Sequence, residues 1–102
     1  MEDIRRSGRY VTQLKAQYFL DDDKDHWKEC TIININPKGM CVEFNEGINV
    51  NSTIHLVIIK SGESEPIIVK GILKWLRQKK NNFIGGIELA ETLEENTFAM
   101  LS

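Results

Sequence analysis

The sequence predicts an all-β domain, a six-stranded antiparallel β-barrel with a short C-terminal helix. Apolar side chains recur at every second position over several short segments, which is the period of a half-buried strand. Charged or turn-forming stretches separate six such segments within residues 10–90. Closing antiparallel strands into a barrel removes exposed strand edges, so a closed or nearly closed barrel is the expected architecture.

The composition limits this fold to one small domain. The 102 residues are 41% hydrophobic and 27% charged, which is typical of a single domain with a small core. A domain of this size leaves most polar side chains at its surface, so any binding site is expected to be shallow. The net charge of -2 argues against a protein that coats DNA or RNA through overall positive charge.

The first two strands are expected to form a hairpin. Residues 10–20 alternate between apolar or aromatic side chains at even positions and polar ones at several odd positions, which predicts a half-buried strand. Residues 21–25 carry too much like charge to pack, so a solvated hairpin loop is expected there. The second strand is expected from about Trp27 to Ile35. One face of it should carry Trp27, Thr31, Ile33 and Ile35.

The next two strands follow a tight turn and a longer connection. The sequence Asn-Pro-Lys-Gly at residues 36–39 suits a type I turn, with a third strand from Met40 to Phe44. Residues 45–52 are polar and form a connection. The following segment, 53–60, is so rich in apolar residues that burial on both faces is expected.

The chain then completes the barrel. After a turn at residues 61–64, apolar and charged residues alternate over residues 67–75, with Trp75 on the same face as Leu73. Residues 79–82 turn the chain into a sixth strand at 83–90. From about residue 91 onwards, acidic residues followed by spaced apolar ones predict one short C-terminal helix or a frayed tail.

Two polar segments are candidates for ligand binding. Arg5, Arg6 and Arg9 lie just before the first strand, and three close guanidinium groups repel one another unless an anion or carboxylates neutralise them. Gly8 lets the backbone bend around a ligand. A solvated basic arm, balanced by the two acids that precede it, is the simpler interpretation of this segment alone.

The second polar segment is the turn between the second and third strands. Asn34 and Asn36 should face the same side, and their amides can both donate and accept hydrogen bonds, as a nucleobase edge requires. Gly39 could adopt a positive φ or let a ligand approach its backbone N–H. A plain turn is the alternative, because Asn, Pro and Gly are ordinary turn residues.

Taken together, the two segments resemble the PilZ domain, the bacterial receptor module for cyclic di-GMP. The resemblance rests on Arg5-x-x-x-Arg9 and, about 25 residues further on, Asn34-x-Asn36-x-x-Gly39. Residues 71–75 and 86–89 look like the closing strands of that family. The resemblance extends from about residue 5 to residue 93. It implies a single-domain protein with a PilZ-like split barrel.

The resemblance also implies where the ligand lies. A flexible arginine-rich segment, residues 1–9, would clasp cyclic di-GMP against the outer surface of a barrel formed by residues 10–102. Arg5 and Arg9 match the two arginines that contact guanine and phosphate in the family. The expected ligand residues are Arg5, Arg6, Arg9, Asn34, Asn36 and Gly39, although Asn36 stands where the family usually has serine.

The leading prediction is a cyclic di-GMP receptor whose N-terminal segment becomes ordered on binding and signals through a partner protein. The family suggests roles in motility, adhesion or exopolysaccharide control. The alternative, motivated by Asn36, is a degenerate PilZ-like interaction module that does not bind the nucleotide. An oligonucleotide-binding barrel ranks third, because exposed aromatics are few and the net charge is negative, so DNA and RNA are not expected partners.

Catalytic and metal chemistry lack the residues they need. Asp21, Asp23 and Asp25 imitate the start of a calcium-binding loop, but His26 and Ile32 occupy the positions that require Gly and Glu. The cysteines and histidines show no zinc-ligand spacing, and no phosphate-binding loop or nucleophile motif is present. We therefore expect no enzymatic activity, no catalytic residue, no metal and no cofactor.

The sequence also gives expectations for location and for one further charged patch. Its first ten residues lack the apolar core of a secretory signal, and no apolar run approaches the roughly 18 residues of a membrane helix. Two cysteines are too few for a secreted disulfide scaffold, so a cytoplasmic protein without membrane insertion is expected. A solvated hairpin end, with a secondary anion or partner contact as the alternative, is expected for Lys74, Arg77, Lys79 and Lys80 near Trp75.

Overall fold

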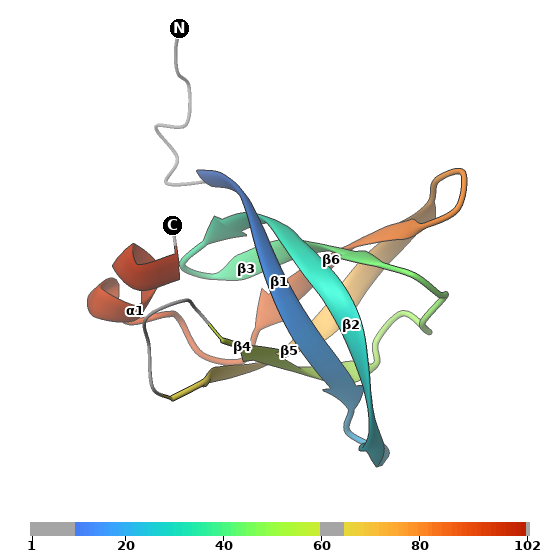
Figure 1. The fold of residues 1–102 in the computed structure, drawn as a ribbon, viewed down its shortest axis with the longest axis horizontal. Helices are drawn as coiled ribbons and strands as arrows, with labels where there is room; N and C mark the ends of the chain where they lie inside the picture. The colour runs from blue at the N-terminus through green and yellow to red at the C-terminus, as the bar shows by residue number, and fades with distance from the viewer. Residues whose placement is uncertain (1–9, 60–64, 102) are drawn as a thin grey trace, which may run out of the picture.

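The computed structural model describes residues 10–59 and 65–101, and they form a closed barrel of six antiparallel strands (Figure 1). The elements are β1 (Tyr10–Leu20), β2 (Asp23–Asn36), β3 (Gly39–Phe44), β4 (Thr53–Ile58), β5 (Ile67–Gln78), β6 (Phe83–Leu89) and α1 (Glu95–Leu101). Around the barrel the strands follow the order β1-β2-β3-β6-β5-β4, and β4 pairs with β1 to close it. The predicted fold class is confirmed. The predicted ligand-clasping segment, residues 1–9, lies outside the described residues.

The interior of the barrel is a packed apolar core. Tyr18 of β1 and Phe44 of β3 meet edge to face, with ring centroids 5.0 Å apart. Fully buried aliphatic residues surround them, namely Ile32, Val42, Ile54, Leu56, Ile58 and Leu73. Apart from the Tyr18 phenol and the Cys30 thiol, no polar or charged side chain among the described residues is buried, so the core is almost entirely apolar.

Tyr18 gives the fold a defined response to alkali. Burial, with smaller contributions from Glu46 and Cys30, raises the pKa of the Tyr18 phenol from 10.0 to about 12. The associated stability is fully present below pH 10, where the unfolded chain keeps the phenol protonated, and is lost as the pH rises towards 12. We expect the urea midpoint of the wild type to fall more steeply over this range than that of Tyr18→Phe. Parallel slopes would contradict the assignment.

Strand β2 begins at Asp23, four residues before its predicted start at Trp27. The expected loop over residues 21–25 is therefore wrong, because only its first two residues turn the chain. This end of the β1–β2 hairpin projects from the body of the barrel, so its charged side chains need no packing (Figure 1). Trp27 Nε1 donates a hydrogen bond to the carbonyl oxygen of Lys24 at 3.0 Å, which helps to hold the start of the strand.

Two β-bulges change which side chains face outwards. In β2 the register against β3 shifts just after Ile32, so Ile32 and Ile35 are both buried and Ile33 is not. In β5 the register against β6 shifts after Leu73, so Leu73 is fully buried while Trp75 is 42% exposed. One extra residue reverses the alternation of a strand. The predictions that Ile35 shares a face with Trp27, Thr31 and Ile33, and that Trp75 shares a face with Leu73, are therefore wrong.

Strand β4 is buried on both faces along part of its length, as predicted. Ile54, Leu56 and Ile58 point into the core, and Val57 on the opposite face is also buried. The strand ends at Ile58, and the following Ile59 is 65% exposed. The predicted end of this strand, Lys60, lies outside the described residues.

The C-terminal segment forms the expected short helix, which packs at one end of the barrel (Figure 1). Leu101 of α1 is 1% exposed and belongs to the core cluster, and Leu93 packs against that cluster. The N–H of Leu93 donates to the carbonyl oxygen of Pro37 at 2.8 Å, which ties this segment to the β2–β3 turn. In the part of the chain that the structure describes, no helix is long and apolar enough to cross a membrane.

Candidate functional site

A groove of about 440 Å³ on the outer surface brings together three of the predicted ligand residues, Asn34, Asn36 and Gly39, with Lys38, Met40, Cys41, Lys74, Trp75, Gly86, Ile87 and Glu88. Pairing across four strands builds its floor. Asn34 of β2 pairs with Cys41 of β3, and Cys41 pairs with Gly86 of β6. Gly86 pairs in turn with Trp75 of β5. The volume lies within the range of small-molecule sites in proteins, and the open shape agrees with a shallow surface site.

Asn34 and Asn36 face the same outer side of β2, as predicted, because Ile35 between them is buried. The side chain of Asn36 has a second role in the turn. Its Oδ1 accepts hydrogen bonds from the backbone N–H groups of Lys38 at 2.8 Å and Gly39 at 3.0 Å. This amide oxygen closes the turn, so the NH₂ group is the part of Asn36 left to donate to a ligand.

Gly39 has a different role from the one the sequence suggests. It does not adopt a positive φ, and its N–H is already donated to Asn36 Oδ1. Glycine is required here because a Cβ atom would lie 2.8 Å from the carbonyl oxygen of Ile87 on β6. Gly39 therefore allows β3 and β6 to approach closely at the edge of the groove, and the expectation of an N–H open to a ligand is wrong.

Trp75 forms an aromatic wall of this groove, a role that the sequence analysis did not assign to it. The indole lies flat against the backbone of β6 at Gly86, where any added Cβ would collide with the ring nitrogen. The guanidinium carbon of Arg77 lies 5.4 Å from the ring centroid. The glycine pair at 85–86, opposite a tryptophan on the neighbouring strand, is the sequence signal that could have revealed this arrangement.

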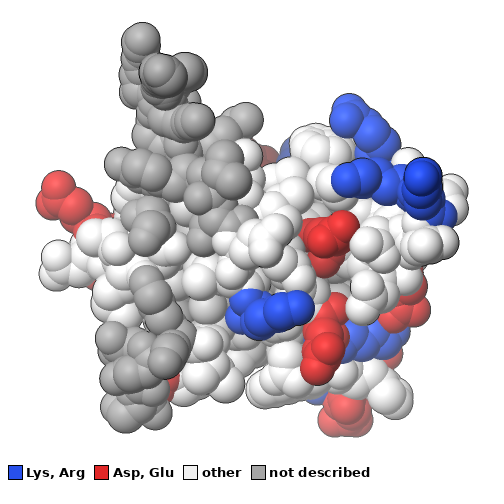
Figure 2. All heavy atoms as spheres, turned by 45° about the horizontal axis from the view of Figure 1, so that its top comes forward, with Lys and Arg blue, Asp and Glu red and all other residues white. Residues whose placement is uncertain are grey.

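The charges at the groove are mixed. Lys74 Nζ lies 3.6 Å from Glu88 Oε1, and both side chains are at least half exposed. Lys38 adds a second cation at the turn. Basic side chains also gather at the end of the β5–β6 hairpin, residues 77–80, as Figure 2 shows at one corner of the molecule. An anion can therefore be held here, although the carboxylate of Glu88 opposes it.

Strand pairing places the start of β1 beside the same groove. Tyr10 pairs with Ile35, and Val11 pairs with Asn34. The predicted ligand residues Arg5, Arg6 and Arg9 lie outside the described residues. In the sequence, however, Arg9 directly precedes Tyr10, whose partner Ile35 lies between the two groove asparagines.

Other chemistry-bearing residues have local structural partners. His26 Nδ1 lies 2.7 Å from Asp23 Oδ1, and His55 Nε2 lies 2.9 Å from Asp21 Oδ1. Burial raises the pKa of the Cys30 thiol to about 12, so the reactive thiolate is disfavoured at neutral pH. No group of three His, Cys, Asp or Glu side chains within residues 10–59 and 65–101 could hold a metal ion.

Comparison with known proteins shows a family and a shared fold. The profile of the PilZ domain family matches residues 3–101. One of seven matching chains of known structure is the Bacillus subtilis inhibitor of motility MotI/DgrA, with a TM-score of 0.68 and 14% sequence identity. The match covers 98% of this chain and 48% of that protein, so this chain spans about half its length. At this identity the likeness shows a shared fold. No curated protein sequence matches significantly.

Proposed function

This chain belongs to the PilZ domain family, and on that premise we propose that it is a receptor for cyclic di-GMP. PilZ domains are binding modules of a cyclic di-GMP receptor family and are not catalysts. We propose that the nucleotide is a signalling ligand for this chain and that no other cofactor is needed. Its site would be the groove that contains Asn34, Asn36 and Trp75.

One observation carries this proposal. The β1–β2 pairing sets Tyr10, which follows Arg9 in the sequence, opposite Ile35, which lies between the two groove asparagines. The two motifs are about 25 residues apart in the chain, and the residue that follows the first of them, Tyr10, pairs within the second. A ligand in the groove would be within reach of residues that immediately precede β1.

The chemistry of the groove suits a cyclic dinucleotide, which carries two guanines and two phosphates. An arginine fork can pair with phosphate oxygens or with the O6/N7 edge of guanine, the roles we propose for Arg5 and Arg9. Arg6 would add a phosphate contact or stack on a base. Trp75, which is 42% exposed, would stack with guanine once the Arg77 guanidinium moves off its ring, while Asn34 offers an amide to the base edge.

The departure from the family pattern at Asn36 is compatible with this role. Because its Oδ1 closes the turn over Lys38 and Gly39, the Asn36 side chain is drawn towards its own backbone. A serine hydroxyl at this position could form the same kind of local hydrogen bond. Asparagine can thus replace serine as a turn-closing residue without necessarily filling the ligand groove.

We propose that bound nucleotide orders the arginine-rich segment, residues 1–9, against the barrel. The ordered segment would create a new surface for a partner protein, as in other switches that order a disordered segment. Such a receptor would act in the bacterial cytoplasm. The structural neighbour is an inhibitor of motility, so motility is the first process to examine, followed by adhesion and exopolysaccharide control.

Calorimetric titration of the folded chain with cyclic di-GMP tests the proposal. We expect saturable heat, with GTP as the control ligand giving none, since GTP lacks the second guanine and the closed diphosphodiester ring. Absence of heat at tens of micromolar protein, in a sample that circular dichroism shows to be folded, would refute nucleotide binding.

The alternative function is a PilZ-fold interaction module that does not bind the nucleotide. Glu88 favours it, because its side chain is 64% exposed at the groove and would repel phosphate. Asn36→Ser and Glu88→Gln separate the two functions. If the wild type does not bind and these changes create binding, the alternative holds; if the wild type binds and they change affinity only a few-fold, the receptor holds.

A further inference from the structure

Three aromatic rings stack across neighbouring strands on the outside of the barrel, away from the nucleotide groove. Phe19 of β1 stacks with Trp27 of β2, with ring centroids 5.2 Å apart and planes inclined by 14°. On its other side Phe19 stacks with His55 of β4, with centroids 4.6 Å apart and planes inclined by 5°. The outermost ring, Trp27, is 50% exposed.

Trp27 is held in a fixed orientation although half of its surface meets solvent. Its Nε1 donates to the carbonyl oxygen of Lys24, and one face is covered by Phe19. Cross-strand pairing accounts for the contact between the rings, because such pairs stabilise sheets. Cross-strand pairing does not, however, explain why a large apolar ring such as Trp27 remains exposed to water. A rigid, exposed tryptophan is instead typical of an anchor in a protein interface.

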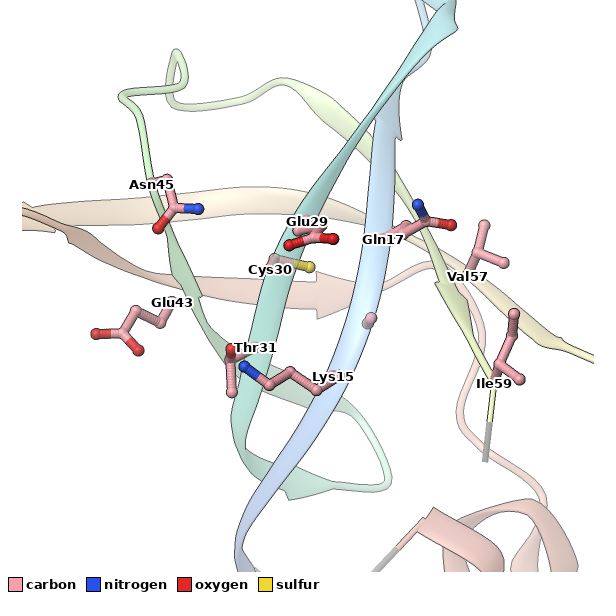
Figure 3. A pocket seen from close by; sticks show the side chains of 10 residues that line it. Lys15, Gln17, Glu29, Cys30, Thr31, Glu43, Asn45, Val57 and Ile59 are labelled. Atoms are coloured by element: carbon pink, nitrogen blue, oxygen red, sulfur yellow. The ribbon is translucent and has the colours of Figure 1, made fainter. Parts of the chain in front are cut away.

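A groove of about 590 Å³, lined in part by Lys15, Gln17, Glu29 and Thr31 of β1 and β2, lies near the aromatic stack; Figure 3 shows its lining side chains. Gln17 and Glu29 pair across β1 and β2, two residues along from Phe19 and Trp27 respectively, so the groove continues directly from the stack. Figure 3 shows the Lys15 side chain reaching over β2 towards Thr31. The stack and this groove together form one surface, called here the β1–β2 face.

The hairpin end of the β1–β2 face, around Trp27, is acidic. Residues 21–29 contain five carboxylates and two lysines, a balance of -3 in a chain whose total charge is -2. One of these lysines, Lys28, is paired with Glu46, its Nζ lying 2.7 Å from Oε2. Asp25 and Glu29 lie two residues on either side of Trp27 in β2, where the register against β1 is irregular. Both are exposed.

We propose that the β1–β2 face docks a basic segment of a partner protein, with an arginine stacked on Trp27 and adjacent cations paired with Asp25 and Glu29. Charge complementarity selects this occupant, because the surface combines an aromatic face with surrounding carboxylates and therefore attracts cations. The same carboxylates repel a phosphate backbone, which disfavours nucleic acid. Docking here does not depend on nucleotide binding in the other groove.

NMR titration of the isotope-labelled full chain with a synthetic peptide of four Arg-Ser repeats tests this proposal. At low salt we expect saturable shifts of the Trp27 indole N–H and of neighbouring amides in β1 and β2. A matched peptide of four Glu-Ser repeats should leave these signals unchanged. Shifts confined to other faces, or equal shifts with both peptides, would overturn the proposal.

Variants separate the docking surface from general charge attraction. Trp27→Leu should weaken peptide binding about fivefold or more, the scale of a lost cation–π contact. The double variant Asp25→Asn, Glu29→Gln should also weaken peptide binding, and it leaves the three stacked rings unsubstituted. The matched control Glu91→Gln, Glu94→Gln removes two exposed carboxylates near α1 and should bind as the wild type does. Equal weakening in the control would overturn the proposal.

Two further measurements distinguish other occupants. Analytical ultracentrifugation would detect a dimer of this chain; a dimer abolished by Trp27→Leu would make a second copy the occupant and overturn the proposal. Single-stranded DNA should not shift the Trp27 indole signal. Saturable shifts with DNA, in place of shifts with the arginine peptide, would equally overturn it.

Discussion

Replacing Arg9 with alanine is expected to weaken cyclic di-GMP binding by about 30-fold, on the order of 2 kcal/mol. Arg9 directly precedes Tyr10, which pairs with Ile35 between the groove asparagines. The variant removes a guanidinium fork that can form two charge-assisted hydrogen bonds with one phosphate or guanine edge. Isothermal titration calorimetry on the wild type and the variant measures the difference directly.

Two controls make this result specific. Lys24→Ala removes one positive charge at the β1–β2 hairpin, away from the nucleotide groove, and should leave the affinity almost unchanged. Arg9→Lys retains the charge but loses the planar fork, so an intermediate affinity is expected. If the wild type binds and Arg9→Ala binds equally well, Arg9 does not contact the ligand.

Replacing Phe44 with alanine is expected to lower the free energy of unfolding by about 3–5 kcal/mol. Phe44 is fully buried, and its ring meets Tyr18 edge to face. Truncation removes apolar contacts and leaves a cavity between strands whose pairing prevents full collapse. Domains of this size are stable by about 5–15 kcal/mol, so the loss is a large part of the total. Urea unfolding followed by tryptophan fluorescence measures it.

Two matched variants show whether volume in the core causes the loss. Phe44→Leu keeps most of the apolar volume and should cost less than Phe44→Ala. Ile68→Ala removes an aliphatic side chain that is 60% exposed and should change stability by about 0.5 kcal/mol or less. A loss below about 1 kcal/mol for Phe44→Ala would contradict the position of this ring in the core.

Much of the fold follows from local patterns. Alternation over β1 and much of β5 predicted these strands, and the Asn-Pro-Lys-Gly segment predicted the turn between β2 and β3. The errors in which side chains share a face occur at the register shifts in β2 and β5. A bulge moves one residue out of register and reverses the faces that follow, and neither Ile33 nor Trp75 has a neighbouring Gly or Pro that marks the shift.

The candidate site was predictable only where it is local. Asn34, Asn36 and Gly39 lie within six residues of one hairpin, so the sequence alone indicated that they belong together. Trp75 and Glu88 reach the same groove from β5 and β6, which depends on pairing between distant segments. The aromatic stack on the other face was missed for the same reason, because Trp27 and His55 come from strands on either side of β1.

By itself, the sequence determined a small all-β barrel and identified the two polar motifs, because strand alternation, turn residues and motif spacing are encoded by neighbouring residues. The tertiary structure decided which side chains share a surface. Register and bulges are set by the packing of the whole barrel, and they direct Trp75 outwards beside Asn34. They also bring Gly39 close to β6, where the Ile87 carbonyl leaves no room for a Cβ atom.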